Sequence, residues 1–95
     1  MFLEISLNLA ITDIEKGLLN AVIDNDIEVV RGILEDCDIN PNIQDTIGNT
    51  LLHIAVMERN SDMVRELLRQ PTVQVNAKNG GGDTPLMVAF LYDAT

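Results

Sequence analysis

His53, the only histidine in the chain, is the first residue to consider for catalysis or metal binding. A zinc site needs several Cys, His or carboxylate ligands, and no second histidine or cysteine lies near His53 in the sequence. A catalytic dyad or triad needs a nucleophile at a motif spacing from the base, and none stands at such a spacing here. We therefore predict that His53 is structural and that the chain is not an enzyme.

Four acidic residues, Asp24, Asp26, Glu28 and Glu35, resemble the ligands of a calcium-binding loop. They match the first, third, fifth and twelfth positions of such a loop. Val29 replaces the glycine that the loop requires, and the apolar residues that follow are spaced like the buried face of a helix. We interpret the acids as helix-start residues that complement the helix dipole, and no metal is predicted.

The glycine run Gly80–Gly82 could belong to a phosphate-binding loop. No lysine or serine follows at the P-loop spacing, and the neighbouring Asp83 would repel an anion. The run is interpreted as a turn, and no cofactor is predicted.

The net charge of −9 argues against direct binding to nucleic acid or to an anionic membrane. Residues 1–48 carry ten acidic and two basic side chains, a net of −8, whereas residues 49–95 carry five and four, a net of −1. The acidity of the first half is interpreted either as a solvating face or as a patch that steers a basic partner.

Features that report on the cellular compartment are few. No apolar run approaches the length of a membrane span, and the first residues do not have the form of a secretory signal. The single cysteine, Cys37, cannot form a disulfide within the chain. Together these features favour a reducing, cytoplasmic location.

The elements that position these residues are organised by an internal repeat. The stretch Gly48–Val56 is followed 34 residues later by the similar stretch Gly82–Phe90. Apolar and small residues also coincide at this shift over most of the chain, for example Ala21, Ala55 and Ala89. A repeat of two short amphipathic helices and an extended turn predicts an all-α solenoid of stacked units.

Two motifs make the resemblance specific. Thr50-Leu-Leu-His-Ile-Ala55 and Thr84-Pro-Leu-Met-Val-Ala89 each differ at one position from the Thr-Pro-Leu-His-x-Ala pattern of ankyrin repeats. The chain thus resembles an ankyrin repeat protein with a lead-in at 1–13, a degenerate first repeat at 14–44, a second at 45–78 and a truncated third at 79–95.

The resemblance implies a structural role for the motif residues. The threonines cap helices, and proline stands at a first helical position, where its missing N–H is harmless. The small alanine lets paired helices approach each other closely. The histidine forms hydrogen bonds that connect its own turn to neighbouring backbone. These positions are Gly48, Thr50, His53, Ala55, Gly82, Thr84 and Pro85.

The resemblance also implies a protein–protein interaction module that binds through its concave turn and inner-helix surface. The usual contact positions of the family are here Gln44, Thr46, Ile47, Asn49, Met57, Glu58, Lys78, Gly80, Gly81, Asp83, Leu91 and Tyr92. The alternative is a truncated remnant of a longer ankyrin array without independent function, because fewer than three complete repeats are present.

Both ends of the repeat region are distinctive. Residues 3–11 fit a strand-like alternation and also a helical spacing, and we favour a helix or a loosely packed lead-in. Thr12 and Glu15 have the form of a capping box, which predicts that a helix begins there.

At the other end of the repeat region, an apolar surface is predicted to lack a covering helix, and this surface could allow self-association. It consists of the stripe Leu86, Ala89 and Phe90, together with Leu67 and Leu68.

Overall fold

The computed structural model describes the backbone of residues 2–36 and 39–93, and the side chains of residues 13–36 and 39–91. Over these residues the chain forms five helices and no β-strand, so the predicted all-α class is confirmed. The helices are α1 Phe2–Ile23, α2 Ile27–Asp36, α3 Leu51–Met57, α4 Ser61–Leu68 and α5 Pro85–Asp93.

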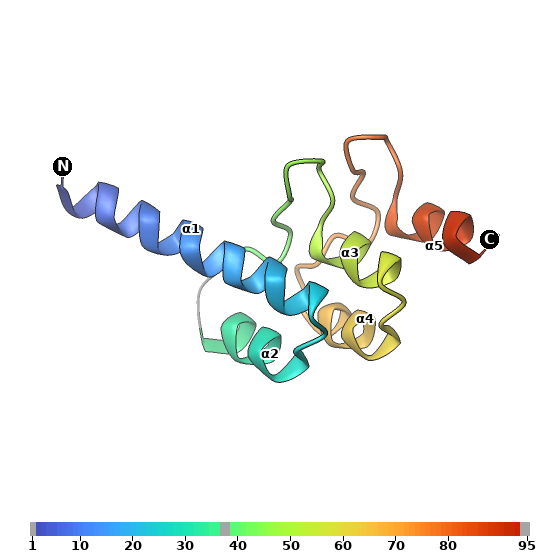
Figure 1. Ribbon diagram of the computed structural model, residues 1–95, viewed down its shortest axis with the longest axis horizontal. Helices are drawn as coiled ribbons and strands as arrows, with labels where there is room; N and C mark the ends of the chain where they lie inside the picture. Colours follow the sequence, from blue (N-terminus) through green and yellow to red (C-terminus); the bar gives the residue numbers. More distant parts are fainter. Residues whose placement is uncertain (1, 37–38, 94–95) are drawn as a thin grey trace.

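The helices form two layers (Figure 1). Helices α1, α3 and α5 follow one another in the first layer, and α2 and α4 lie side by side in the second. Two long turns, between α2 and α3 and between α4 and α5, project beyond the first layer next to each other. Within the described part of the chain, α5 contacts α3 and has no second-layer helix beneath it.

The N-terminal lead-in is part of a helix. Helix α1 runs without a break from Phe2 to Ile23, so the predicted helix start at Thr12 is wrong. A capping box operates only where the preceding backbone leaves the helix, and here residues 2–11 are already helical. The proposed division between residues 13 and 14 therefore falls inside α1.

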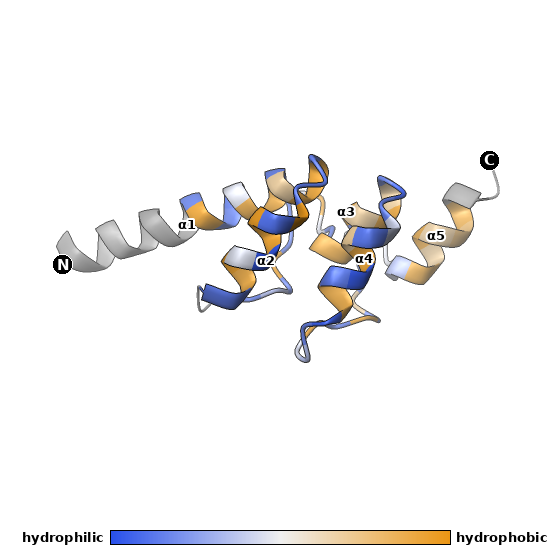
Figure 2. Cartoon of the chain, turned by 90° about the horizontal axis from the view of Figure 1, so that it is seen from below, coloured by the Kyte–Doolittle hydropathy of each residue, from blue (hydrophilic) through white to orange (hydrophobic). Residues whose placement is uncertain are grey.

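The core lies between the two layers of the first two repeats. Its fully buried side chains include Leu18 and Val22 from α1, Val30 from α2, and Met63 from α4. Helix α3 is the most deeply enclosed element, since all five of its residues from Leu51 to Ala55 are buried. Figure 2 shows blue hydrophilic segments alternating with orange ones along α2 and α4, as expected of helices with one solvated face.

Helix α5 buries a different residue from the predicted stripe. Val88 is 4% exposed, whereas Leu86 and Phe90 are 78% and 76% exposed. The reason is that α5 packs mainly against α3, so only one side of it is well covered. Of the two leucines predicted to lose cover in α4, Leu68 is 49% exposed but Leu67 is buried in the core, and the expectation for Leu67 is therefore wrong.

Candidate functional site

The turn before α3 is built by Asp45. Its side-chain Oδ1 accepts hydrogen bonds from the backbone N–H groups of Ile47, at 2.9 Å, and Asn49, at 2.8 Å. The backbone closes the same turn, because Gly48 N–H donates to Asp45 O at 3.0 Å. Gly48 has φ +92°, a conformation that favours glycine. The turn therefore has a defined shape, with Ile47 at its tip and 67% exposed.

The turn before α5 repeats this construction around Asn79. Asn79 Oδ1 accepts from the backbone N–H groups of Gly81 and Asp83, both at 3.0 Å. Gly82 N–H donates to Asn79 O at 3.0 Å, in the place of the Gly48 bond. An aspartate and an asparagine can play the same part because each presents a side-chain oxygen to the N–H groups two and four residues later.

The two turns are bonded directly to each other. Gly80 N–H donates to Ile47 O at 2.9 Å, and Asn79 Nδ2 donates to Asn49 Oδ1 at 3.0 Å. A β-carbon on Gly80 would lie 2.2 Å from Ile47 O, and one on Gly48 would lie 2.6 Å from Gly80 N. Side chains at either glycine would force the turns apart, so the tips form one continuous ridge.

His53 joins the second repeat to the third. Thr50 caps α3 by accepting from His53 N–H at 3.3 Å, and Thr50 N–H donates to His53 Nδ1 at 3.2 Å. On the other side of the ring, Nε2 lies 2.7 Å from the Asp83 carbonyl oxygen. A carbonyl oxygen can only accept, which assigns the proton to Nε2. The ring is fully buried and both nitrogens have partners, which leaves neither for a metal or for proton transfer.

A shallow groove runs between α1 and the first turn. It has a volume of about 360 Å³. Glu15, Lys16 and Leu19 of α1 form one wall, and Gln44, Asp45 and Thr46 form the other. The groove therefore combines one aliphatic side chain with charged and amide groups, a composition that suits a peptide segment better than an apolar small molecule.

Most of the predicted contact residues lie at the surface. The side chain of Gln44 is exposed but donates to the Gly48 carbonyl oxygen at 2.8 Å, which holds it against the turn. The side chain of Tyr92 lies outside the described residues. Met57 and Asp83 are half-buried, and the exposed positions are Gln44, Thr46, Ile47, Glu58, Lys78, Gly80, Gly81 and Leu91.

Two predicted contact residues also bond the two turns to each other. Asn49 is 7% exposed and its amide is bonded to Asn79, so its side chain is not available to a partner. Gly80 is exposed, but its backbone is bonded to Ile47 and space permits no side chain there. Both positions hold the two turns together, a role that depends on a contact between repeats.

One exposed apolar residue on the inner helices was not predicted from the sequence. Ile23 is 47% exposed at the end of α1, and a shift of 34 residues brings it onto Met57 and then onto Leu91. The same shift that revealed the repeat could therefore have found it. Ile23, Met57 and Leu91 therefore occupy equivalent positions of the three inner helices, and we call these three residues the apolar row.

A second cluster, on α2 and α4, was not predicted. Glu66 is 5% exposed and accepts hydrogen bonds from Arg31 of α2 and, at 3.3 Å, from Arg69. The bond from Arg31 lowers the pKa of the Glu66 carboxyl below its usual value, against the effect of burial. The Arg31–Glu66 pair links the second-layer helices of successive repeats, and only tertiary structure brings these residues together.

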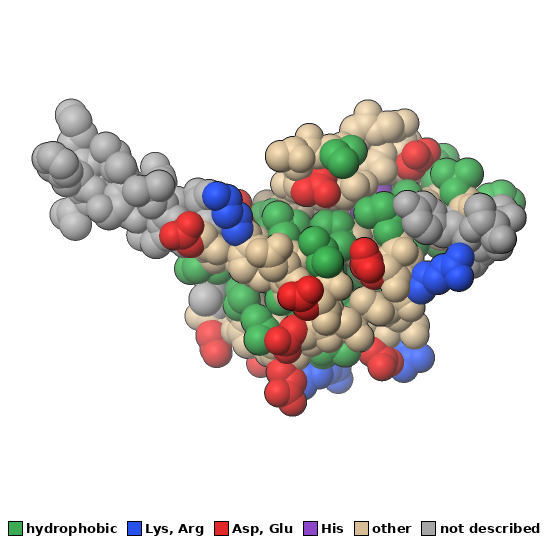
Figure 3. All heavy atoms as spheres, viewed as in Figure 1, with side chains coloured by type: hydrophobic (Ala, Val, Ile, Leu, Met, Phe, Trp, Pro, Cys, Tyr) green, Lys and Arg blue, Asp and Glu red, His purple; other side chains and the backbone are tan. Residues whose placement is uncertain are grey.

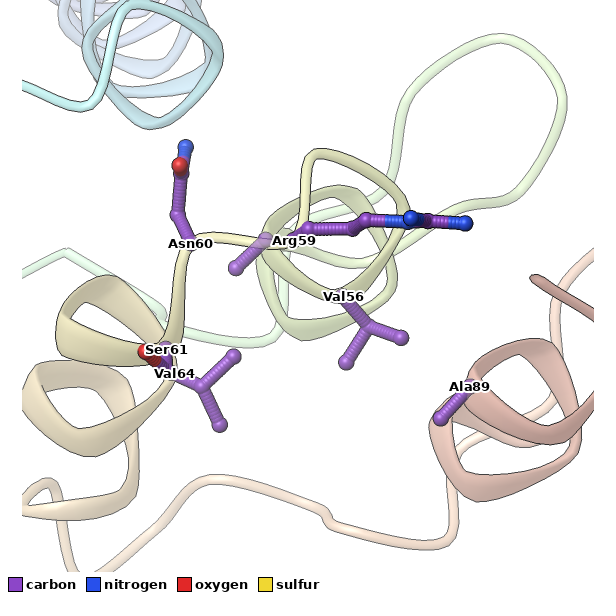
Figure 4. A pocket seen from close by; sticks show the side chains of 7 residues that line it. Val56, Arg59, Asn60, Ser61, Val64 and Ala89 are labelled. Carbon is purple, nitrogen blue, oxygen red and sulfur yellow. The ribbon is translucent and has the colours of Figure 1, made fainter. Parts of the chain in front are cut away.

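The open side of α5 borders an apolar cleft. Figure 4 shows Val56, Val64 and Ala89 projecting from α3, α4 and α5 towards the space between the three helices. This cleft has a volume of about 230 Å³, with Arg59, Asn60 and Ser61 at its rim. A neighbouring cleft, also of about 230 Å³, is lined by apolar side chains that include Leu52, Leu68 and Leu86.

The two-layer stack of helix pairs with hydrogen-bonded turns defines a repeat protein, and similarity to known protein families identifies which one. The sequence profile described as ankyrin repeats (3 copies) matches residues 18–95, and the chain belongs to the ankyrin repeat family, as its motifs predicted. Ankyrin repeats are protein–protein interaction modules and are typically not enzymatic.

Curated relatives are similar over part of their length. Mouse rabankyrin-5 is 38% identical over 53 residues, which are 56% of this chain and 4% of that protein. A putative ankyrin repeat protein of Rickettsia bellii is 38% identical over 66% of this chain and 64% of its own length. The I-kappa-B like protein C1 of Microplitis demolitor bracovirus is 39% identical over 78% of this chain and 40% of its own length.

A solved structure has the same fold. It is a chain from the complex of the Bdellovibrio bacteriovorus predatory endopeptidase Bd0816 with the immunity protein Bd3460. It superimposes with a TM-score of 0.70 and 36% identity over 81% of this chain and 39% of its own length. No helix within the described residues is long and apolar enough to span a membrane.

Proposed function

We propose that this chain binds a segment of a partner protein across its turn tips and inner helices, without catalysis. The observation that carries the proposal is the apolar row Ile23, Met57 and Leu91 on the inner helices, together with the exposed Ile47 at a turn tip. Large apolar side chains at the surface are the usual anchors of protein interfaces.

The backbone of the two turn tips favours binding with little rearrangement. The turn tips are fixed by the Asp45 and Asn79 side chains and by the bond from Gly80 to Ile47. A partner that contacts a rigid surface avoids the entropy cost of ordering it. The solved relative from Bdellovibrio is described as part of a complex with a protein, which is consistent with this type of role.

The surface suggests a partner with apolar side chains one repeat apart. Packed helices lie about 8–10 Å from each other, so Ile23, Met57 and Leu91 offer contacts at that interval. The acidic half of the chain, with a net charge of −8 over residues 1–48, favours a basic segment at the α1 end. The partner is thus expected to be an extended, basic and apolar peptide segment.

A displayed peptide library provides the test. Peptides selected on this chain are expected to carry apolar residues and a net positive charge. Met57→Glu and Ile47→Glu should each weaken the selected peptides by about tenfold or more, because a charge replaces an apolar anchor. Val29→Glu, which adds the same charge on α2 at a 44% exposed position, is the matched control and should not alter binding.

The opposite result is equally clear. The proposal is overturned if the selected peptides bind Met57→Glu and Ile47→Glu as tightly as the original chain. It is also overturned if Val29→Glu abolishes their binding. Either result would place the binding surface elsewhere.

A further inference from the structure

Among the described side chains, those of α5 include more exposed large apolar residues than those of any other helix. Leu86, Phe90, Leu91 and Met87 are 78%, 76%, 54% and 50% exposed, and we call these four residues the C-terminal patch. No charged residue lies between Pro85 and Leu91. Figure 2 shows the described part of α5 in orange and tan for most of its length, so residues 85–91 have no charged face to turn towards water.

The patch has the form of a helix-packing surface. Leu86 with Phe90, and Met87 with Leu91, are pairs four residues apart, which form two parallel ridges on a helix. A hollow of about 370 Å³ lies among these side chains, with Asp83 at its edge. Ridges and a hollow on one surface allow the same surface of another molecule to interdigitate with it.

The charge distribution selects this end for contact between identical chains. Residues 1–48 carry a net charge of −8 and residues 49–95 a net charge of −1. Figure 3 shows red acidic side chains over α1, α2, α4 and the turns, and green hydrophobic ones beside α5. Two copies that meet through their first halves repel each other, whereas copies that meet through α5 keep their acidic halves far apart.

We propose that the C-terminal patch binds a second copy of this chain, with α5 packed antiparallel against α5. The contact is isologous, so Phe90 and Leu86 of one copy lie against the same residues of the other. Because four side chains per copy are fewer than a standard interface contains, the dimer is weak and reversible. The contact uses α5, so it occupies Leu91 of the apolar row and leaves Ile23, Ile47 and Met57 available to a different protein.

Sedimentation velocity on the whole chain tests the proposal. Between about 10 and 500 µM, the range expected for a contact below standard size, the average mass should rise from monomer to dimer and stop there. Phe90→Glu should weaken association by about tenfold or more. Val29→Glu adds the same charge at the far end of the molecule and should leave the association constant unchanged.

Two further measurements make the outcome decisive. Since Phe90 is 76% exposed, the thermal melt of Phe90→Glu in dilute solution should match that of the original chain; if it does not, Leu86→Glu, at a 78% exposed position outside the apolar row, replaces it. Association should also not weaken between low and high salt, because the four patch side chains carry no charge whose attraction salt would screen.

Four results would overturn the proposal. They are a monomer at every concentration, growth beyond the dimer, a dimer that Phe90→Glu does not weaken, and a dimer that Val29→Glu weakens as much.

Discussion

The second and third repeats begin with nearly the same sequence but have different surroundings. Leu52 is 6% exposed in α3, while its equivalent Leu86 is 78% exposed in α5. Ala55 is fully buried, whereas Ala89 is half-buried at the edge of a cleft. Helix α3 is flanked by α1, α4 and α5, and α5 contacts α3.

The difference teaches that the repeat motif specifies local geometry and that neighbours specify burial. Thr50 and Thr84 accept the same type of capping bond, from His53 N–H and from Met87 N–H, both at 3.3 Å. Such a bond depends on residues three apart and forms in both repeats. Burial requires helices from adjacent repeats, so its contribution to stability is concentrated in α3.

The largest expected effect comes from truncating equivalent leucines. Leu52→Ala should lower the free energy of unfolding by about 2–5 kcal/mol, because it leaves a cavity in the core. Leu86→Ala should change it by less than about 0.5 kcal/mol, since that side chain is mostly in water. Urea denaturation of both variants measures the difference. Equal losses would mean that α5 is as well covered in solution as α3.

His53→Ala should have the next largest effect. It removes the partners of Thr50 N–H and of the Asp83 carbonyl oxygen, which should lower the free energy of unfolding by about 1–3 kcal/mol. Met87→Ala, at the equivalent and half-exposed position, should have little effect.

Hydrogen exchange distinguishes the two histidine contacts. Because the Asp83 bond joins the second repeat to the turn before α5, amides of residues 85–91 should lose more protection in His53→Ala than those of α1. Uniform loss of protection along the chain would instead indicate that the capping bond in α3 accounts for the whole effect.

Glu66→Gln should have the smallest effect, and one that depends on pH. The hydrogen bond from Arg31 depresses the pKa of Glu66, so the ion pair stabilises the fold above the usual glutamate pKa of about 4.3. This contribution is lost as the pH falls through the lower, folded-state value. At pH 7 the variant should be less stable by about 1 kcal/mol, and the difference should shrink between about pH 5 and pH 3.

The matched control for this pair is Asp62→Asn. Asp62 forms an exposed ion pair with Arg65 at 3.6 Å on the same helix, and such pairs contribute little. Urea midpoints of the two variants at several pH values are to be compared with those of the original chain. A Glu66→Gln difference that is constant from pH 7 to pH 3 would contradict a role for the carboxylate charge.

The sequence by itself determined the features that depend on short-range contacts and on the repeat. The shift of 34 residues predicted the all-α stack, and the ankyrin motif predicted the family. Gly48 adopts the positive φ expected of a turn glycine, and Thr50 caps α3. These outcomes are set within a few residues, where steric limits and capping bonds leave little choice.

The tertiary structure decided what happens between repeats. The sequence placed Asn49 and Gly80 on the binding surface, but contact between the two turns makes Asn49 a buried hydrogen-bonding group and Gly80 a site of close approach. Arg31 and Glu66 are 35 residues apart and meet only because α2 lies beside α4. Leu86 and Leu52 occupy the same motif position, yet only Leu52 is buried. Burial depends on the helices that surround each residue, and a local sequence pattern does not specify those neighbours.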